Sequence, residues 1–130
     1  MEKLAEYLYK VTRVRKLTPD EENIIAVNPY YSYMYADNVI KKPFLKGEEA
    51  ISKDAGCSYY YAKYVIKRPF PKGEDAISKD SYYSYRYAKD VLKGPFPKSE
   101  EAIASSPYYS YLYAYNILKL PGHKAKKWKS

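Results

Sequence analysis

Several residue types are scarce in this 130-residue sequence, and each scarcity excludes a class of protein. Cys57 is the single cysteine, so no intramolecular disulfide can form, and a reducing, cytoplasmic setting is expected. The single histidine, His123, is not spaced with Cys57 as a zinc site or a Cys–His nucleophile requires. No apolar run approaches the length of a membrane span, so no membrane association is expected. The first ten residues contain acids and lack an apolar stretch, so no signal peptide is expected.

The sequence also lacks the motifs of common enzymes. No glycine-rich phosphate-binding loop or Walker pattern occurs. Glu48, Glu74 and Glu100 are candidates for a paired acid and base, but they recur at a constant spacing, which repetition alone explains. A carboxylate in the first turn of a helix, where negative charge suits the helix dipole, is the simpler interpretation. We therefore predict a protein that is not an enzyme and that takes no cofactor or metal ion.

Acidic residues are absent from the last part of the chain. The net charge is +8, and the segment 105–130 contains five lysines and no acid. The basic character is therefore concentrated near the C-terminus, above all in residues 121–130, PGHKAKKWKS. We predict that this segment is a basic, flexible tail. The alternative is an arm that binds nucleic acid through Lys126 and Lys127.

Tyrosine, by contrast, is abundant, with 19 residues, and it reveals an internal repeat whose period is constant along the chain. The columns of the repeat are Tyr7, Tyr33, Tyr59, Tyr85 and Tyr111; Tyr9, Tyr35, Tyr61, Tyr87 and Tyr113; Ile25, Ile51, Ile77 and Ile103; Ala36, Ala62, Ala88 and Ala114; and Phe44, Phe70 and Phe96. Five such periods fill the chain. Constant self-similarity at this length is typical of a stacked array, in which one unit cannot bury its apolar face alone.

The stretch SYYSYRYAKDV, residues 81–91, alternates tyrosine with smaller or polar residues, which is the period of a strand. The signals at the ends of such stretches favour a helix instead. Good N-cap residues precede them (Asn28, Asp54, Asp80 and Ser106), and prolines that would stop a helix follow them (Pro43, Pro69, Pro95 and Pro121). We therefore predict helices over 29–41, 55–67, 81–93 and 107–119, with a β-solenoid as the alternative.

A helical wheel of residues 29–41 separates constant columns from variable ones. Its inward face holds Pro29, Ser32, Tyr33, Ala36, Val39 and Ile40, with Tyr35 at the margin, and these columns change little between units. The columns that vary most lie on the opposite face, where a helix would expose them. A strand would place Asp37 and Lys41 on the same side as Tyr33, which makes a poor core face.

Each predicted long helix is followed by a turn and a shorter helix. The predicted fold is all-α: a short α-solenoid of five 26-residue helix-turn-helix repeats, of which the last is incomplete. The repeats are 1–26, 27–52, 53–78, 79–104 and 105–120, followed by the tail 121–130. The third unit departs from the others, because Ala55-Gly56-Cys57 stands where they carry Pro or Ser and then two tyrosines. Cys57 is predicted to be a small residue at a tight contact between units.

Two units, PYYSYMYADNVIKKPFLKGEEAISKD and SYYSYRYAKDVLKGPFPKSEEAIAS, resemble short helical-pair repeats in uncharacterised bacterial and bacteriophage proteins. The resemblance covers nearly the whole chain. It rests on the columns Tyr-x-Tyr-Ala, Pro-Phe and Gly-Glu-x-Ala-Ile. It implies a repeat scaffold of bacterial or phage origin, and it supplies no catalytic motif.

Two candidate surfaces follow from the predicted stack. The outward columns would form a ribbon with tyrosine and arginine, which are enriched at binding hot spots: Met34, Tyr60, Lys63, Tyr64, Arg86, Lys89, Leu112 and Tyr115. A lysine column (Lys41, Lys67, Lys93 and Lys119) would form a basic stripe interleaved with aromatic rings, suited to a phosphate backbone and stacked bases. A second lysine column (Lys46, Lys72, Lys98 and Lys124) recurs close to acids, which would mute its field.

The leading hypothesis is a non-catalytic scaffold that binds another macromolecule, above all a protein. The phage-like resemblance sharpens it to an inhibitor that occludes a host defence complex, for example a CRISPR–Cas nuclease, in the host cytoplasm. The alternative is a binder of RNA or single-stranded DNA that uses lysine stripes and tyrosine stacking. A third hypothesis is a structural repeat that self-assembles end to end, because the last unit lacks its short helix. Otherwise we expect a monomer or weak self-association.

Overall fold

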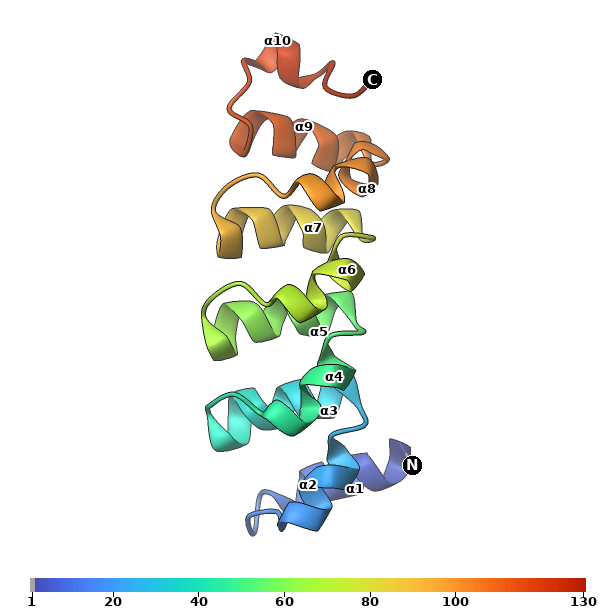
Figure 1. Ribbon diagram of the computed structural model, residues 1–130, viewed down its shortest axis with the longest axis vertical. Coiled ribbons are helices and arrows are strands. Elements are labelled where there is room, and N and C mark those ends of the chain that lie inside the picture. Colours follow the sequence, from blue (N-terminus) through green and yellow to red (C-terminus); the bar gives the residue numbers. More distant parts are fainter. Residues whose placement is uncertain (1) are drawn as a thin grey trace.

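Short and long helices alternate along the chain in the computed structural model, which describes residues 2–130. The long segments lie side by side in chain order, and the two ends of the chain lie at opposite ends of the elongated stack (Figure 1). Each long segment contacts the next long segment and the short helix that follows it. No strand occurs within the described range, so the all-α prediction is confirmed and the β alternative is wrong.

The long segments begin as α-helices, and three of them continue as wider π-helices. They are α1 (Glu2–Val11), α3 (Pro29–Met34) with η1 (Tyr35–Ile40), α5 (Ala55–Tyr60) with η3 (Tyr61–Ile66), α7 (Ser81–Tyr87) with η5 (Ala88–Leu92), and α9 (Pro107–Asn116). The short helices are α2 (Pro19–Ile25), α4 (Glu48–Ile51), α6 (Glu74–Ile77), α8 (Glu100–Ala104) and α10 (Gly122–Ala125). The 3-10 turns η2 (Leu45–Gly47), η4 (Pro71–Gly73) and η6 (Pro97–Ser99) precede α4, α6 and α8. None of the helices in residues 2–130 has the length and apolar content needed to cross a membrane.

Capping side chains set where the long helices begin, as the sequence predicts. The side-chain oxygen of Asn28, Asp54 or Asp80 accepts a hydrogen bond from the backbone N–H three residues later. The Ser106 hydroxyl does the same for α9. Pro29 occupies the first position of its helix, where a backbone N–H has no partner within the helix. The predicted helix starts are therefore confirmed.

A lysine in the left-handed conformation ends each of four long segments. Lys41, Lys67, Lys93 and Lys119 have φ angles of 53, 55, 55 and 61°. Backbone bonds across six residues close the wide turn: the Arg68 N–H donates to the Ala62 carbonyl at 3.2 Å, and the Gly94 N–H donates to the Ala88 carbonyl at 3.1 Å. The prolines that the sequence suggested as stop signals come two residues after these lysines, where they prevent continuation.

The helical wheel and the structure differ at one column of the repeat. A wheel drawn at 3.6 residues per turn places Val39 and Ile40 inside and Tyr35 at the margin. In the structure Tyr35 is buried, whereas Val39 and Ile40 are only half-buried. Val39 and Ile40 nevertheless pack against the core, as the wheel places them, so the wheel is wrong only for Tyr35. Tyr113, in the same column, is buried in α9 without a π turn.

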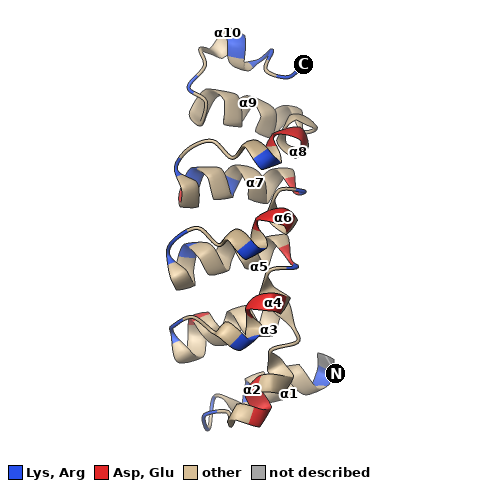
Figure 2. Cartoon of the chain, in the orientation of Figure 1, with Lys and Arg blue, Asp and Glu red and all other residues tan. Residues whose placement is uncertain are grey.

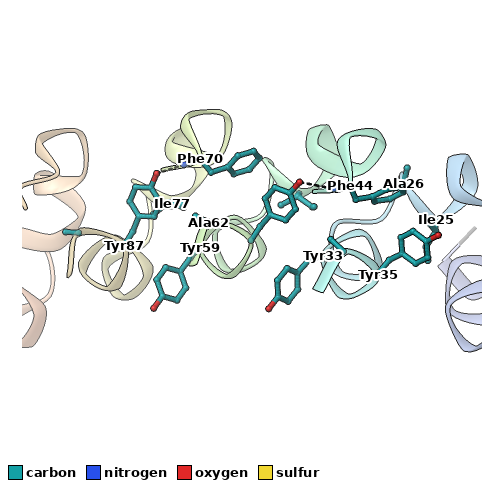
Figure 3. Packing of buried hydrophobic residues seen from close by; sticks show 14 of the residues in the cluster. Ile25, Ala26, Tyr33, Tyr35, Phe44, Tyr59, Ala62, Phe70, Ile77 and Tyr87 are labelled. Atoms are coloured by element: carbon teal, nitrogen blue, oxygen red, sulfur yellow. Dashed lines mark hydrogen bonds between the residues drawn. The ribbon is translucent and has the colours of Figure 1, made fainter. Parts of the chain in front are cut away.

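The core is a row of constant columns that runs along the stack, and ten of its residues are labelled in Figure 3. The alanine and isoleucine columns are completely buried: Ala36, Ala62, Ala88, Ala114, Ile25, Ile51, Ile77 and Ile103. Phe70 packs edge-on against Tyr61, with ring centroids 5.1 Å apart, and the same pair recurs in the neighbouring units. Because each unit supplies only part of this core, neighbouring units must stack to remove it from water.

A buried tyrosine hydroxyl connects each unit to the one before it. Tyr61 donates to the Glu48 carboxylate at 2.5 Å and accepts from the Phe44 backbone N–H at 3.1 Å. Tyr87 and Tyr113 repeat both bonds in the following units. Burial, reinforced by the bond to the carboxylate, raises the pKa of all three tyrosines. The glutamate column, which the sequence suggested only as capping carboxylates, therefore also accepts a hydrogen bond from the next unit.

Residues 121–130, which the sequence predicts to be a basic, flexible tail, include α10. This helix contacts α9, and Ala125 within it is 2% exposed. The Trp128 ring lies 5.2 Å from the Tyr113 ring, centroid to centroid. The segment folds because it covers apolar surface of α9 that would otherwise face water. The unfinished edge that motivated the self-assembly hypothesis is therefore occupied by this segment.

Candidate functional site

Four lysines form a row at the C-terminal ends of the long segments. We name Lys41, Lys67, Lys93 and Lys119 the basic edge, and all four are exposed. Figure 2 shows basic residues along this side of the stack and acidic residues gathered on α2, α4, α6 and α8. Lys126 and Lys127, the other lysines predicted to contact nucleic acid, are exposed after α10 and lie outside this row.

The backbone of the basic edge is unfavourable for lysine. The left-handed region costs a residue with a side chain roughly 1–2 kcal/mol, whereas glycine adopts it freely. A cation at a helix C-terminus gains about 0.3–1 kcal/mol from the helix dipole. The dipole therefore does not offset the whole cost, yet no unit carries glycine in this column. Backbone strain that local forces do not explain is concentrated at functional positions.

Consecutive lysines of the basic edge line depressions between neighbouring long segments. Lys41 and Lys67 flank a depression of about 220 Å³ whose lining includes Tyr64. Lys67 and Lys93 flank the next, of about 290 Å³, and Lys93 and Lys119 flank a third, of about 410 Å³. Among the side chains of residues 3–130, these four ammonium groups form no ion pair. Pairs of uncompensated ammonium groups at a regular spacing suit an anionic chain such as a phosphate backbone.

Asp90 lines the second depression, but its neighbours compensate its charge. Arg86 Nε lies 3.1 Å from Asp90 Oδ2, Lys63 Nζ lies 3.5 Å from the same oxygen, and the Tyr59 hydroxyl donates to it. Burial alone would raise the pKa of Asp90, but the hydrogen bonds from Tyr59 and Arg86 lower it. Asp37 lines the first depression, and its carboxylate accepts a hydrogen bond from the Tyr33 hydroxyl at 3.1 Å.

The second lysine column has a different environment. Lys46 Nζ lies 3.5 Å from Glu22, Lys72 Nζ lies 3.8 Å from Glu49, and Lys98 pairs with Asp75. Each of these acids belongs to the preceding unit. These three lysines are therefore paired with acids, but not with the acids two or three positions away in the same unit that the sequence suggested.

The ribbon predicted to bind a protein is only partly available. Its members fall into three groups: Tyr64, Lys89 and Tyr115 are exposed; Met34, Tyr60 and Leu112 are half-buried against the core; Lys63 and Arg86 are half-buried and held by Asp90. Long tyrosine, methionine and leucine side chains fold back onto the stack because this removes apolar surface from water. Five of the eight residues are therefore less accessible than the sequence predicts.

A second candidate site lies at the start of α5, where the sequence loses a tyrosine pair. Gly56-Cys57 stands at the position that holds Tyr30-Tyr31, Tyr82-Tyr83 and Tyr108-Tyr109 in other units. The site is an open hollow of about 410 Å³, which we name the tyrosine hollow. Its lining is Tyr30, Tyr33, Asp54, Gly56, Cys57, Tyr60, Tyr64 and Tyr83. Burial raises the pKa of the Cys57 thiol to about 12, so the thiol is protonated and unreactive at neutral pH.

Sequence reasoning placed Tyr60 and Tyr64 on the outward ribbon and Tyr30 and Tyr83 beside it, but it assigned Tyr33 to the core and did not group these rings into a hollow. The available signal was the departure at Gly56-Cys57, which predicted a tight contact. That expectation describes Gly56, where an added Cβ would lie 3.0 Å from the Tyr83 hydroxyl oxygen. It does not describe Cys57, which lines the space that the absent rings leave.

Comparison with known proteins identifies no relative. No protein-family model matches the chain, and neither a curated protein nor a solved structure matches it. The similarity to bacterial and phage repeat proteins therefore stays a prediction.

Proposed function

We propose that the protein is a non-catalytic α-solenoid of five repeats that binds single-stranded nucleic acid along its basic edge. The observation that supports the proposal is the row of depressions, each flanked by two exposed lysines without an ion pair within residues 3–130. The left-handed backbone of the row adds support, since lysine is kept where glycine would be easier.

Aromatic side chains favour a single strand over a duplex as the ligand. Tyr64 lines the first depression beside Lys41 and Lys67, and its ring is 47% exposed. An exposed ring can stack on an unpaired base, whereas the bases of a duplex already stack on one another. Asn116 lines the third depression and offers amide groups that can hydrogen-bond a base or a sugar.

The decisive experiment measures fluorescence anisotropy of labelled single-stranded RNA and DNA over a series of salt concentrations. If four lysines each neutralise one phosphate, log K should fall with log salt concentration with a slope of about −3. The variant K67Q/K93Q/K119Q should bind more weakly and show a shallower slope, of about −1.

The chain supplies its own control for total charge. The variant K46Q/K72Q/K98Q removes the same number of charges from the column that is paired with acids. This variant should bind almost as tightly as the native protein. Equal losses in the two triple variants would indicate non-specific attraction, and an absence of binding at low salt would overturn the proposal.

Protein binding is the second candidate function, and one observation favours it. Tyr30, Tyr82 and Tyr108 are 53, 37 and 67% exposed and recur at the start of successive long helices. Tyrosine is enriched at protein interfaces, and an inhibitor that occludes a host defence complex is the specific form of this hypothesis. Binding to a purified partner that is insensitive to salt and lost in Y82A/Y108A would support it.

A further inference from the structure

We propose that the tyrosine hollow seats one unpaired base of the bound strand, while the phosphates beside that base lie against Lys41 and Lys67. This inference rests on the proposed function and deepens it. It gives an otherwise repetitive surface a single position where a base is held, and it therefore sets the register of the strand along the stack.

The hollow exists because one ring is missing from a regular contact. In later units Tyr83 packs on Tyr59, and Tyr109 packs on Tyr85, each with ring centroids 5.9 Å apart. The equivalent neighbour of Tyr33 is Cys57, which has no ring. The Tyr60 ring approaches Tyr33 instead, with centroids 6.1 Å apart, and the hollow lies between these rings and Cys57. A planar aromatic guest is the kind of molecule that replaces the absent contact.

The walls of the hollow are aromatic rings that already pack on one another. The Tyr60 and Tyr64 rings are nearly parallel, with centroids 6.2 Å apart and an interplanar angle of 11°, and Tyr83 meets Tyr60 edge-on at 78°. A base would therefore add to the outside of this cluster and not enter between the two parallel rings. The volume of about 410 Å³ lies within the range of small-ligand sites. Asp54, at the rim, provides a carboxylate that can accept hydrogen bonds from the amino group of a base.

One side chain joins the hollow to the basic edge. Tyr64 lines the tyrosine hollow and also the depression flanked by Lys41 and Lys67. A base in the hollow is therefore placed next to two ammonium groups that carry no ion pair within residues 3–130. The two depressions flanked by Lys67 and Lys93 and by Lys93 and Lys119 have no ring of the tyrosine hollow in their lining.

The charges around the hollow disfavour a cationic guest, the other common ligand of tyrosine-lined sites. Lys63 Nζ already lies 5.1 Å from the centre of the Tyr64 ring, so a native cation takes this position. Lys41 and Lys67 line the adjacent depression together with Asp37, so two ammonium groups lie beside one carboxylate there. A nucleotide brings negative charge that balances the second ammonium group, whereas a cationic guest adds to the excess.

The test compares a short oligoadenylate with an abasic strand of the same length, which has the same phosphates but no bases. Native protein should bind the oligoadenylate about tenfold more tightly than the abasic strand, the effect of stacking one base. The variant G56Y/C57Y restores the tyrosine pair of the other units and should fill the hollow. Its preference for the oligoadenylate should disappear, while its affinity for the abasic strand and its salt dependence stay native.

The filled variant follows a pattern that the chain already uses, so its fold is expected to survive. The Tyr83 hydroxyl must move by a few tenths of an ångström, and it is the far end of a mobile side chain. C57S is the matched control and should keep the native preference. If G56Y/C57Y fails to fold, Y64S provides a second reading, with loss of the preference expected again.

The outcomes separate the two proposals. Equal binding of both strands by the native protein would overturn the base site and leave the basic edge intact. Persistence of the preference in G56Y/C57Y or in Y64S would place the base elsewhere and also overturn it. Failure of both strands to bind at low salt would overturn the proposed function itself, and a guest with a positive charge or a protein would then be the ligand to seek.

Discussion

The two lysine columns of this protein have the same period and the same residue type, yet they lie in opposite environments. Lys46, Lys72 and Lys98 pair with acids of the preceding unit, on the side where the short helices gather negative charge (Figure 2). The basic edge has left-handed backbone angles and no ion pair within residues 3–130. The comparison teaches that the charge environment of a repeated lysine depends on which unit lies beside it, and not on its residue type or period.

The largest effect should come from titrating the buried tyrosines that tie the units together. Burial and a carboxylate partner raise the pKa of Tyr61, Tyr87 and Tyr113 above the ordinary value of about 10. Below that pH both states keep the protons, so the stabilisation is complete. Above it the unfolded state loses protons that the folded state retains, so the free energy of unfolding should fall steeply.

Urea unfolding followed by circular dichroism between about pH 8 and pH 11 measures this effect. The repeated arrangement predicts cooperative loss of structure at the alkaline end. A free energy of unfolding that stays level up to pH 11 would contradict the role of these hydroxyls.

The next effect should come from removing one hydroxyl. Tyr87→Phe leaves the Phe70 backbone N–H and the Glu74 carboxylate without their shared partner. The expected loss is about 1–3 kcal/mol of unfolding free energy, measured by urea denaturation at neutral pH. Tyr82→Phe, which changes a more exposed ring, is the matched control and should have little effect. Similar losses of unfolding free energy in both variants would mean that the buried hydrogen bonds stabilise the fold no more than an exposed hydroxyl does.

A smaller effect, of opposite sign, is expected at the basic edge. Lys67→Gly removes the strain of a left-handed lysine and should stabilise the fold by about 0.5–1 kcal/mol. The same change should weaken binding of single-stranded nucleic acid, because one ammonium group is lost. Lys72→Gly is the control: this residue lies in a 3-10 turn with an ordinary backbone, so glycine should destabilise it. A destabilised Lys67→Gly variant would show that the side chain serves stability.

The smallest effect should come from an ion pair on the side of the short helices. Lys98→Gln breaks the exposed pair with Asp75, and exposed pairs contribute little in water. No measurable change in the midpoint of thermal unfolding is expected, at low or high salt. A clear decrease in the midpoint temperature that disappears at high salt would mean that the exposed ion pairs, and not only the tyrosine hydroxyls, hold the units together.

Much of the fold could be predicted from the repeat, because each signal was local and recurred. The N-cap at Asp54 and the buried columns of Ala62 and Ile51 needed only the chemistry of single positions. The π-helical turns could not be predicted, because a wheel assumes one constant period. The folding of residues 121–130 was missed because a basic composition hides Trp128, whose partner Tyr113 lies outside the segment.

The candidate site divides in the same way. The repeat in the sequence revealed the lysine column of the basic edge. It also showed that Gly56-Cys57 replaces the tyrosine pair of other units. One lysine column is paired with acids and the other, among the described residues, is not, because different side chains of the neighbouring unit lie beside them. The residue type at a single position does not reveal these neighbours. The hollow likewise depends on rings from three units, among them Tyr33 and Tyr83.

By itself the sequence determined the period, the helix starts and the identity of the buried columns, since caps and apolar side chains act within a few residues of the chain. Only the tertiary structure decided which lysines stay without a carboxylate, where the missing ring leaves space, and how Tyr64 links the two candidate sites. The physical reason is that charge compensation and packing act through space, between units that lie a full repeat apart in the sequence.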